Sequence, residues 1–263
     1  STEQSAGHKP EVGVGPHPQP WPDDPKFDPE LLAEGDRRNV IDRFRYWRRE
    51  AIVEELDQYR HDFHVAIENW EHDLNIGTVV RNANAFLAAG VHIVGKKRWN
   101  RRGAMVTDRY QHVTHHPTIE DLLAWAATEN LPVIGIDNLP GCVPLETTDL
   151  PKHCVFLLGQ EGPGLSEQAR QAVTKVCSIA QYGSTRSINA GVASGIAMHA
   201  WIRQHADPSV GKDVHHRRRL AAILLAFPGV LAAHLLAYQW VNLGPLTTQN
   251  GVGHGYLPTA VPV

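Results

Sequence analysis

Short apolar runs separated by helical patterns dominate the chain from residue 63 onward. Five runs are apolar almost throughout, which is typical of strands that are covered on both faces of a sheet. We predict strands at Phe63–Ile67, Val91–Val94, Val133–Ile136, Cys154–Leu158 and Val176–Ala180.

Helical patterns fall between these runs, at about Gly77–Ala89, Ile119–Glu129, Ser166–Thr174 and Ile188–Gln204. Thr118 and Ser166 are suited to cap two of them. The alternation predicts an α/β fold with a mostly parallel sheet and helices on both faces, and ligands bind such sheets at the carboxyl ends of the strands. We assign residues 63–206 to this domain.

The segments before the predicted domain differ in composition. Residues 1–29 are rich in Pro and Gly, and we interpret them as a disordered tail. Residues 30–62 have helical periodicity, interrupted at Gly35, and many arginines with Tyr46 and Trp47 between them. This basic helical extension is either a solvated helix docked on the domain or a surface that contacts RNA.

Residues 207–263 contain a basic cluster, His215–Arg219, followed by an apolar run, Leu220–Val241. The run is long enough to span a bilayer, but Pro228-Gly229 and His234 interrupt it. A helical hairpin packed on the body or on a partner chain is the alternative. We do not expect membrane association, and the role of this tail stays open.

Composition narrows the possible functions. The formal net charge is −3, so a nucleic-acid partner would need a locally basic face. The 3 cysteines form no CxxC pair, which favours reduced, buried thiols, and the 16 histidines have no metal-ligand spacing, so we expect no metal. With no signal-peptide pattern at the N-terminus, we expect a cytoplasmic protein.

Three segments combine polar side chains with strand-to-helix junctions. In the first, Asn75 and Gly77 open a helix and Arg81 follows about one turn later. In the second, Val155–Leu165, a strand ends in a sharp loop rich in Gly and containing Glu161. In the third, Ile179–Trp201, Ser187-Ile188-Asn189 starts a helix of small residues, which allows close packing against another helix or a dimer partner.

Together these segments resemble the SpoU (TrmH) family of SPOUT RNA methyltransferases, over about Val65–His205. The family's Asn-x-Gly then Arg motif is matched by Asn75, Gly77 and Arg81. Its Leu-Gly-x-Glu-x-x-Gly-Leu loop is matched by Leu158–Leu165. Its Ser-Leu-Asn motif appears as Ser187-Ile188-Asn189, with Ile in place of Leu, and Ala190-Gly191 follows where Val-Ser is usual.

The resemblance implies a C-terminal deep trefoil knot, which is an exception to the rule that chains are not knotted. It also implies a homodimer, S-adenosylmethionine as the methyl donor, and transfer to a ribose 2′-hydroxyl. The implied catalytic residues are Arg81, Asn75, Glu161, Ser187 and Asn189. The implied cofactor-binding residues are Leu158, Gly159, Gly164, Ile179, Ile188 and Asn138. Asn138 lies in Asp137–Leu139, the segment after the third predicted strand, which should close over the cofactor although no motif fixes the residue.

Arg81 is the residue that the resemblance places at the reacting hydroxyl. Arg stays protonated and is a poor base, so we expect it to stabilise the developing oxyanion and to anchor a phosphate. The RNA partner, tRNA or rRNA, is expected on the basic loop Gly95–Tyr110, for which a solvated hairpin is the alternative. The basic residues of this loop are Lys96, Lys97, Arg98, Arg101, Arg102 and Arg109.

Two other functions remain open. A non-catalytic RNA-binding protein of the same fold is the first, although Arg81 and the Gly-Glu loop are both present. A nucleotide-dependent α/β enzyme is the second, but neither GxGxxG nor GxxxxGK[ST] follows the first strand. The sequence does not distinguish tRNA from rRNA.

Overall fold

A computed structural model describes residues 13–71 and 75–207 of the chain. Within these ranges, seven strands form one sheet in the order β3-β2-β1-β6-β4-β7-β5, and every neighbouring pair is parallel. The strands are β1 His61–Asn69, β2 Ala88–Gly95, β3 Val113–His116, β4 Val133–Ile136, β5 Val143–Pro144, β6 Cys154–Leu158 and β7 Lys175–Ser178. The predicted parallel α/β sheet is confirmed.

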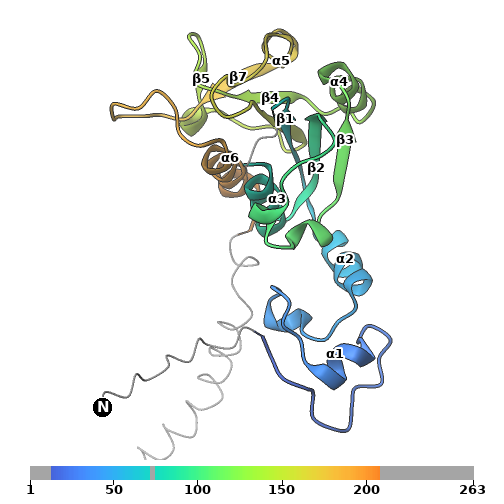
Figure 1. Cartoon of the computed structure of the whole chain (residues 1–263). Coiled ribbons are helices and arrows are strands. Elements are labelled where there is room, and N and C mark those ends of the chain that lie inside the picture. Colours follow the sequence, from blue (N-terminus) through green and yellow to red (C-terminus); the bar gives the residue numbers. More distant parts are fainter. Residues whose placement is uncertain (1–12, 72–74, 208–263) are drawn as a thin grey trace, which may run out of the picture. The chain divides into compact units, whose positions relative to one another are not determined.

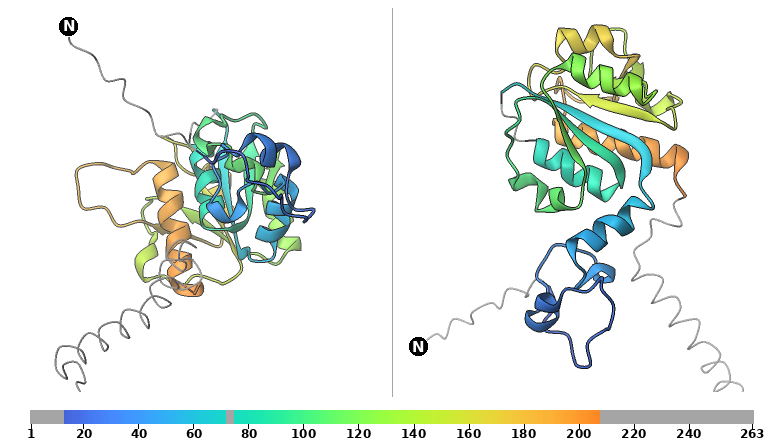
Figure 2. Two further views of the ribbon diagram at one scale, coloured as in Figure 1. Left: turned by 90° about the horizontal axis from the view of Figure 1, so that it is seen from below. Right: turned by 90° about the vertical axis from the view of Figure 1, so that its right-hand side faces the viewer.

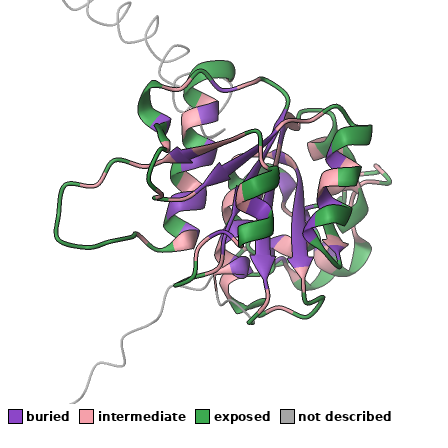
Figure 3. Cartoon of the chain, turned by 90° about the horizontal axis from the view of Figure 1, so that it is seen from above, coloured by how far each residue is buried: buried purple, intermediate pink, exposed green. Residues whose placement is uncertain are grey.

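Helices cover both faces of the sheet (Figures 1 and 2). On one face lie α3 (Ile76–Ala85) and α6 (Ala190–His205), and on the other lie α4 (Ile119–Thr128) and α5 (Glu167–Ala172). Two further helices precede the sheet, α1 (Pro29–Glu34) and α2 (Arg49–Asp57). The central strands are buried on both faces, as their unbroken apolar runs predict (Figure 3).

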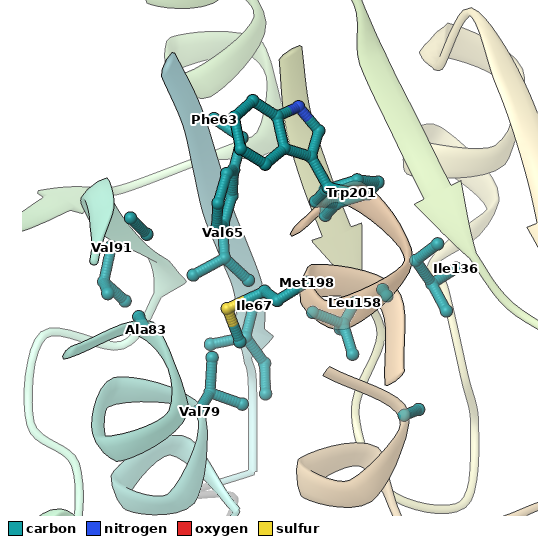
Figure 4. Close-up of a cluster of buried hydrophobic side chains, with 14 of the residues drawn as sticks. Phe63, Val65, Ile67, Val79, Ala83, Val91, Ile136, Leu158, Met198 and Trp201 are labelled. Carbon is teal, nitrogen blue, oxygen red and sulfur yellow. The ribbon is translucent and has the colours of Figure 1, made fainter. Parts of the chain in front are cut away.

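The larger core lies between the sheet and the pair α3 and α6. Trp201 of α6 is 1% exposed, and its ring centroid lies 4.7 Å from that of Phe63 on β1. Its indole Nε1 donates to the backbone oxygens of Pro151 and Lys152. Met198, Leu158 and Val79 continue this core toward the carboxyl edge of the sheet (Figure 4). Packing therefore fixes α6, and with it the start of the helix, against the strand ends.

Two expectations for the N-terminal region differ from the structure. Residues 13–28, part of the segment assigned to a disordered tail, pair with the chain that follows: Val14 bridges Asp36, and the His17 amide donates to Leu32. The periodicity after Gly35 does not produce one continuous helix. The buried Asp36 carboxylate accepts hydrogen bonds from the backbone amides of Arg38 and Tyr46 and stabilises a loop there instead.

Other expectations fall outside the described residues. The basic cluster His215–Arg219 and the apolar run Leu220–Val241 belong to residues 208–263, which the structure does not describe. The trefoil knot stays a prediction. Within residues 13–71 and 75–207, no helix is both long enough and apolar enough to cross a membrane.

Candidate functional site

The carboxyl ends of four neighbouring strands meet at one edge of the sheet. The strand register places Leu158 of β6 beside both Ile67 of β1 and Ile136 of β4, and Ile136 beside Cys177 of β7. Because all four strands are parallel, the loops that follow them emerge at the same edge. These loops contain the three segments singled out in the sequence.

The loop after β6 is held in a tight fold. The backbones of Gln160 and Gly164 hydrogen-bond to each other in both directions, which closes the loop on itself. A Cβ atom at Gly159 would overlap the backbone of Gly164 and Leu165. Gly164 has φ +72°, and the Asp137 carboxylate packs against it and accepts a 2.9 Å hydrogen bond from the Leu165 amide. Gly159 is therefore required by close backbone approach, and Gly164 by its positive φ and by the Asp137 carboxylate packed against it.

A cavity of about 280 Å³ lies beside this loop, near the lower end of the ~300–1,000 Å³ usual for small-molecule sites. The predicted cofactor residues all line it, and so do two of the predicted catalytic residues. These lining residues are Leu158, Gly159, Gly164, Ile179, Ile188 and Asn138, with Glu161 and Ser187.

Three of the predicted catalytic side chains hydrogen-bond to one another. Glu161 Oε2 accepts from Asn75 Nδ2 at 2.8 Å, from Asn189 Nδ2 at 3.3 Å and from the Ala190 amide at 3.1 Å. Asn189 Nδ2 also donates to Asn75 Oδ1 at 2.8 Å, while Asn189 Oδ1 caps α6. The carboxylate thus joins the starts of α3 and α6 to the loop after β6. The three segments converge in space.

Arg81 lies apart from this network. It is exposed on α3 and does not line the cavity, and no hydrogen bond or ion pair within the described residues involves it. Its helix is nevertheless fixed against the basic loop, because Gly77 packs directly on the backbone of Gly103 and Ala104. The guanidinium is thus presented to solvent on the helix that begins at Asn75.

The basic loop after β2 leaves the same edge of the sheet. Its six predicted RNA-binding residues, Lys96, Lys97, Arg98, Arg101, Arg102 and Arg109, are all exposed or half-buried at the surface. Within the loop the Arg101 guanidinium lies 5.5 Å from the Trp99 ring and 3.3 Å from the Asp108 carboxylate. The Asn69 side chain donates to the backbone oxygens of Lys96 and Arg98, which ties the loop to the end of β1.

The small residues at the start of α6 serve a contact within the chain. A Cβ atom at Gly191 would press on the Thr78 side chain of α3. Asn82 Nδ2 donates to the Gly191 oxygen at 2.9 Å and to Ser194 Oγ at 3.1 Å. The departure from the family pattern at Ala190-Gly191 therefore coincides with close packing of α3 on α6.

The arginines of the N-terminal region are largely engaged in local structure. Arg38 pairs with the buried Asp36, Arg43 with Glu55, and Arg45 with Asp42. Arg48 donates to the Phe27 oxygen, and Arg49 pairs with Glu50. These contacts favour the docked-helix interpretation of the extension over a phosphate-binding face.

Two residues at the cavity were not found by sequence reasoning. Arg170 lies on α5 and Gln181 follows β7, and both line the cavity. Only its position just after a strand could have indicated Gln181, because no motif includes it. The segment Asp137–Leu139, which the resemblance placed over the cofactor, also lines the cavity. Two polar atoms of this wall, Arg170 Nε and Gln181 Oε1, are buried without a hydrogen-bond partner in the described chain.

The cysteines and histidines do not form part of this site. Cys154 and Cys177 are buried, as expected of apolar thiols, and burial raises the pKa of Cys154 to about 12, while Cys142 is half-buried. Within residues 13–71 and 75–207, no three His, Cys, Asp or Glu side chains are grouped so that they could hold a metal ion.

Comparisons with known proteins identify relatives of this chain. An uncharacterized tRNA/rRNA methyltransferase of Mycobacterium bovis is 30% identical over 163 residues, 59% of this chain and 50% of that protein. A similarly named protein of Mycobacterium avium is 33% identical over 147 residues, 53% of this chain and 47% of that protein. The chain spans about half the length of the curated relatives it matches.

Two solved structures share the fold. The AdoMet-bound rRNA methyltransferase from Sinorhizobium meliloti is 25% identical with a TM-score of 0.50, over 56% of this chain and 59% of that one. The TrmH/SpoU tRNA modifying enzyme of A. aeolicus is 20% identical with a TM-score of 0.55, over 62% of this chain and 85% of that one. The model of the SpoU rRNA methylase family matches residues 62–199, more than half of the chain. The chain therefore belongs to the SpoU rRNA methylase family.

Proposed function

We propose that this protein transfers a methyl group from S-adenosylmethionine to a ribose 2′-hydroxyl of tRNA or rRNA. One observation carries the proposal: Glu161 joins Asn75 and Asn189 directly beside a cavity at the strand ends. The names of the relatives, tRNA/rRNA methyltransferases, support the substrate class, and the site residues lie within residues 62–199, which match the SpoU rRNA methylase family.

The cavity wall fits the proposed methyl donor. Apolar side chains such as Leu158, Ile179 and Ile188 suit an adenosyl group, and an unpaired donor and an unpaired acceptor in the wall of the described chain suit a ligand that carries both kinds of group. The Gly159–Gly164 loop brings backbone close to the ligand space. When bound, the donor supplies a methyl group already activated on a positively charged sulfur.

The chain's own residues would position the hydroxyl and stabilise charge. Glu161, held by two asparagine amides and the Ala190 amide, fixes the geometry of the loop. Arg81 is exposed and uncommitted in the described structure, so its guanidinium is available to an RNA phosphate and to the oxyanion that forms as the hydroxyl loses its proton. Ser187 also lines the cavity and is the last of the five proposed catalytic residues.

RNA binding is assigned to the basic loop. Its six cations lie after β2, at the edge of the sheet where the cavity opens, so they offer phosphate contacts in an otherwise acidic chain. The Arg101 guanidinium lies over the Trp99 ring, 5.5 Å from its centroid, so this loop also offers an aromatic side chain beside its cations.

We also propose that the protein forms a homodimer through α6. Val192 and Ile196 lie one turn apart on this helix and are 54% and 38% exposed. Apolar side chains side by side on a helix surface are typical of a face that a partner covers.

Replacing Arg81 tests the catalytic assignment. The Arg81→Ala variant should bind S-adenosylhomocysteine with affinity within about threefold of wild type, because Arg81 does not line the cavity. Its methyl transfer to RNA should fall by about 100-fold or more, the usual loss for one oxyanion-stabilising group. Arg203→Ala, an exposed arginine of α6, is the matched control.

Full activity in the Arg81→Ala variant would show that Arg81 has no catalytic role. A wild-type chain that binds RNA but neither binds S-adenosylhomocysteine nor methylates would instead support the non-catalytic RNA-binding function.

A further inference from the structure

The start of the basic loop is built around one buried side chain. Asn69, the last residue of β1, is 0% exposed, and its Nδ2 donates to the Lys96 oxygen at 2.7 Å and to the Arg98 oxygen at 3.0 Å. The Asn69 backbone oxygen accepts from the Lys96 amide at 2.8 Å. Two carbonyl oxygens face the side-chain nitrogen, so the amide can point only this nitrogen, its donor end, toward them.

The backbone that leaves β2 therefore curls around this amide. Gly95 has φ +103°, and a Cβ atom there would lie 2.9 Å from the Asn69 oxygen, so the turn is also tightly packed. The three residues that follow, Lys96, Lys97 and Arg98, all have exposed side chains. A fixed stretch of backbone thus presents three consecutive cations to solvent.

Other parts of the site are held by contacts that do not involve the Asn69 side chain. The far end of the basic loop is anchored by Gly103, which packs on the backbone of Gly77 in α3. The loop after β6 is tied to the same end of the sheet by Gln160 Oε1, which accepts from the Trp70 amide at 2.8 Å. Loss of the Asn69 amide should therefore loosen residues 96–98 and leave α3 and the cavity in place.

We propose that Asn69 is a positioning residue for RNA, because it holds Lys96, Lys97 and Arg98 as one preorganised set of phosphate-binding cations. This inference rests on the proposed function, which assigns RNA to the basic loop. Cations on a fixed backbone lose less conformational freedom on binding than cations on a mobile segment, so they bind the RNA backbone more tightly. Asn69 is buried and acts only through the backbone that it holds.

The test measures methyl transfer to bulk tRNA and to bulk rRNA by an Asn69→Asp variant. Aspartate has the same shape but only acceptor oxygens, which repel the two carbonyl groups. The KM for RNA should rise about tenfold or more, whereas kcat and the affinity for S-adenosylhomocysteine should stay within about threefold of wild type. Asn69→Ala, which removes the donor without adding charge, should raise the KM in the same way.

Asn100→Asp is the matched control. It adds the same charge to the same loop but keeps the side-chain oxygen that accepts from the Arg102 amide at 2.9 Å. Its KM for RNA should rise by less than about threefold, because salt screens an exposed charge. Thermal unfolding of each variant establishes that the fold is retained.

A second comparison separates positioning from a general structural role. In a chain that carries Lys96→Ala, Lys97→Ala and Arg98→Ala together, Asn69→Asp should raise the KM no further, since the cations through which it acts are gone. An equal rise with and without these cations would overturn the inference. So would an unchanged KM in both Asn69 variants, or a loss of kcat or of cofactor affinity as large as the rise in KM.

The proposed function fails separately from this inference. If the wild-type chain transfers no methyl group to either RNA, the proposed function is wrong. The same variants compared by their dissociation constants for RNA then decide whether Asn69 positions the loop.

Discussion

At the scale of single residues, the loop after β6 depends on the absence of side chains. Gly159 and Gly164 approach so closely that a Cβ atom at position 159 has no space, whereas a Cβ atom at Gly183 would meet no other atom within 4 Å. Leu165 and Asp137 then lock the loop in place. The Gly-rich motif is therefore a packing requirement of the loop itself.

Substitution of Gly159 tests this requirement. Gly159→Ala must displace the backbone of Gly164, so affinity for S-adenosylhomocysteine should fall about tenfold or more, equivalent to ~1.4 kcal/mol. Calorimetry measures the change, and Gly183→Ala, where the added methyl group meets nothing, is the control. Equal affinities in both variants would show that the loop tolerates the shift.

The sequence predicted many of these residues but not their partners. Asn75, Glu161 and Asn189 belong to recognisable motifs, and the structure joins them by hydrogen bonds. Gln181 belongs to no motif, and Asp137 was indicated only as part of the segment after β4, because the place of both residues at the cavity depends on which strands neighbour each other. β4 lies between β6 and β7, an order that no local pattern in the chain reveals.

At the scale of elements, a chain of hydrogen-bonded histidines, two of them buried and one half-buried, connects three strands. His64 on β1 hydrogen-bonds His92 on β2 at 2.9 Å, and His92 bonds His116 on β3 at 2.9 Å, with Trp125 of α4 packed over His92. Burial lowers the pKa of His64 to about 4 and that of His92 to about 2, and it also lowers the pKa of His116. The folded protein therefore keeps these rings neutral.

This chain of rings makes stability fall in mild acid. Below about pH 6.5 the unfolded chain takes up protons that the folded chain excludes, so the free energy of unfolding should fall by up to ~1.4 kcal/mol per pH unit for each buried ring. The stability present above pH 6.5 is lost as the pH drops toward about 4, the lowered pKa of His64. Urea unfolding at about pH 7.5, 6.5, 5.5 and 4.5, which brackets the range in which histidine titrates, measures the slope of the free energy of unfolding against pH.

A variant separates the buried histidines from the other titrating groups. His92→Gln removes the central ring and should make the dependence on pH shallower, whatever its effect on stability at neutral pH. His199→Gln, at an exposed position on α6, should leave the slope unchanged. Identical slopes in His92→Gln and wild type would contradict the explanation.

Sequence patterns predicted the bounds of a strand best where all its residues are buried. Strands β4 and β6 begin and end as predicted, because each is apolar throughout. Strand β3, Val113–His116, was missed because it is a polar edge strand, half of whose residues are exposed. Helix α3 ends at Ala85, since the segment from Ala88 joins the sheet as β2 rather than extending the helix.

At the scale of the whole molecule, the exposed apolar face of α6 predicts association. Val192→Glu combined with Ile196→Glu would place two like charges at a dimer interface and should yield a monomer in analytical ultracentrifugation. Val143→Glu, at a position 41% exposed on β5, is the control and should remain dimeric. A wild-type chain that sediments as a monomer would rule out the proposed dimer.

The trefoil knot and the dimer were both implied by the family resemblance. The described structure adds an argument only for the dimer, through the exposed apolar side chains of α6. Physical reasoning from periodicity predicts elements and their burial, but the threading of a chain and its assembly depend on contacts between distant segments. The division into a catalytic domain, residues 63–206, and flanking segments likewise stays a prediction.

The chemical position of the transferred methyl group tests the central claim most directly. The full chain is incubated with tRNA or rRNA and methyl-labelled S-adenosylmethionine, and the product RNA is hydrolysed in alkali, which needs a free 2′-hydroxyl to cleave. We predict that the label stays in alkali-resistant dinucleotides and is lost in Arg81→Ala. Label recovered in mononucleotides, which would indicate base methylation, or no incorporation by the wild-type chain into either RNA, would contradict the account.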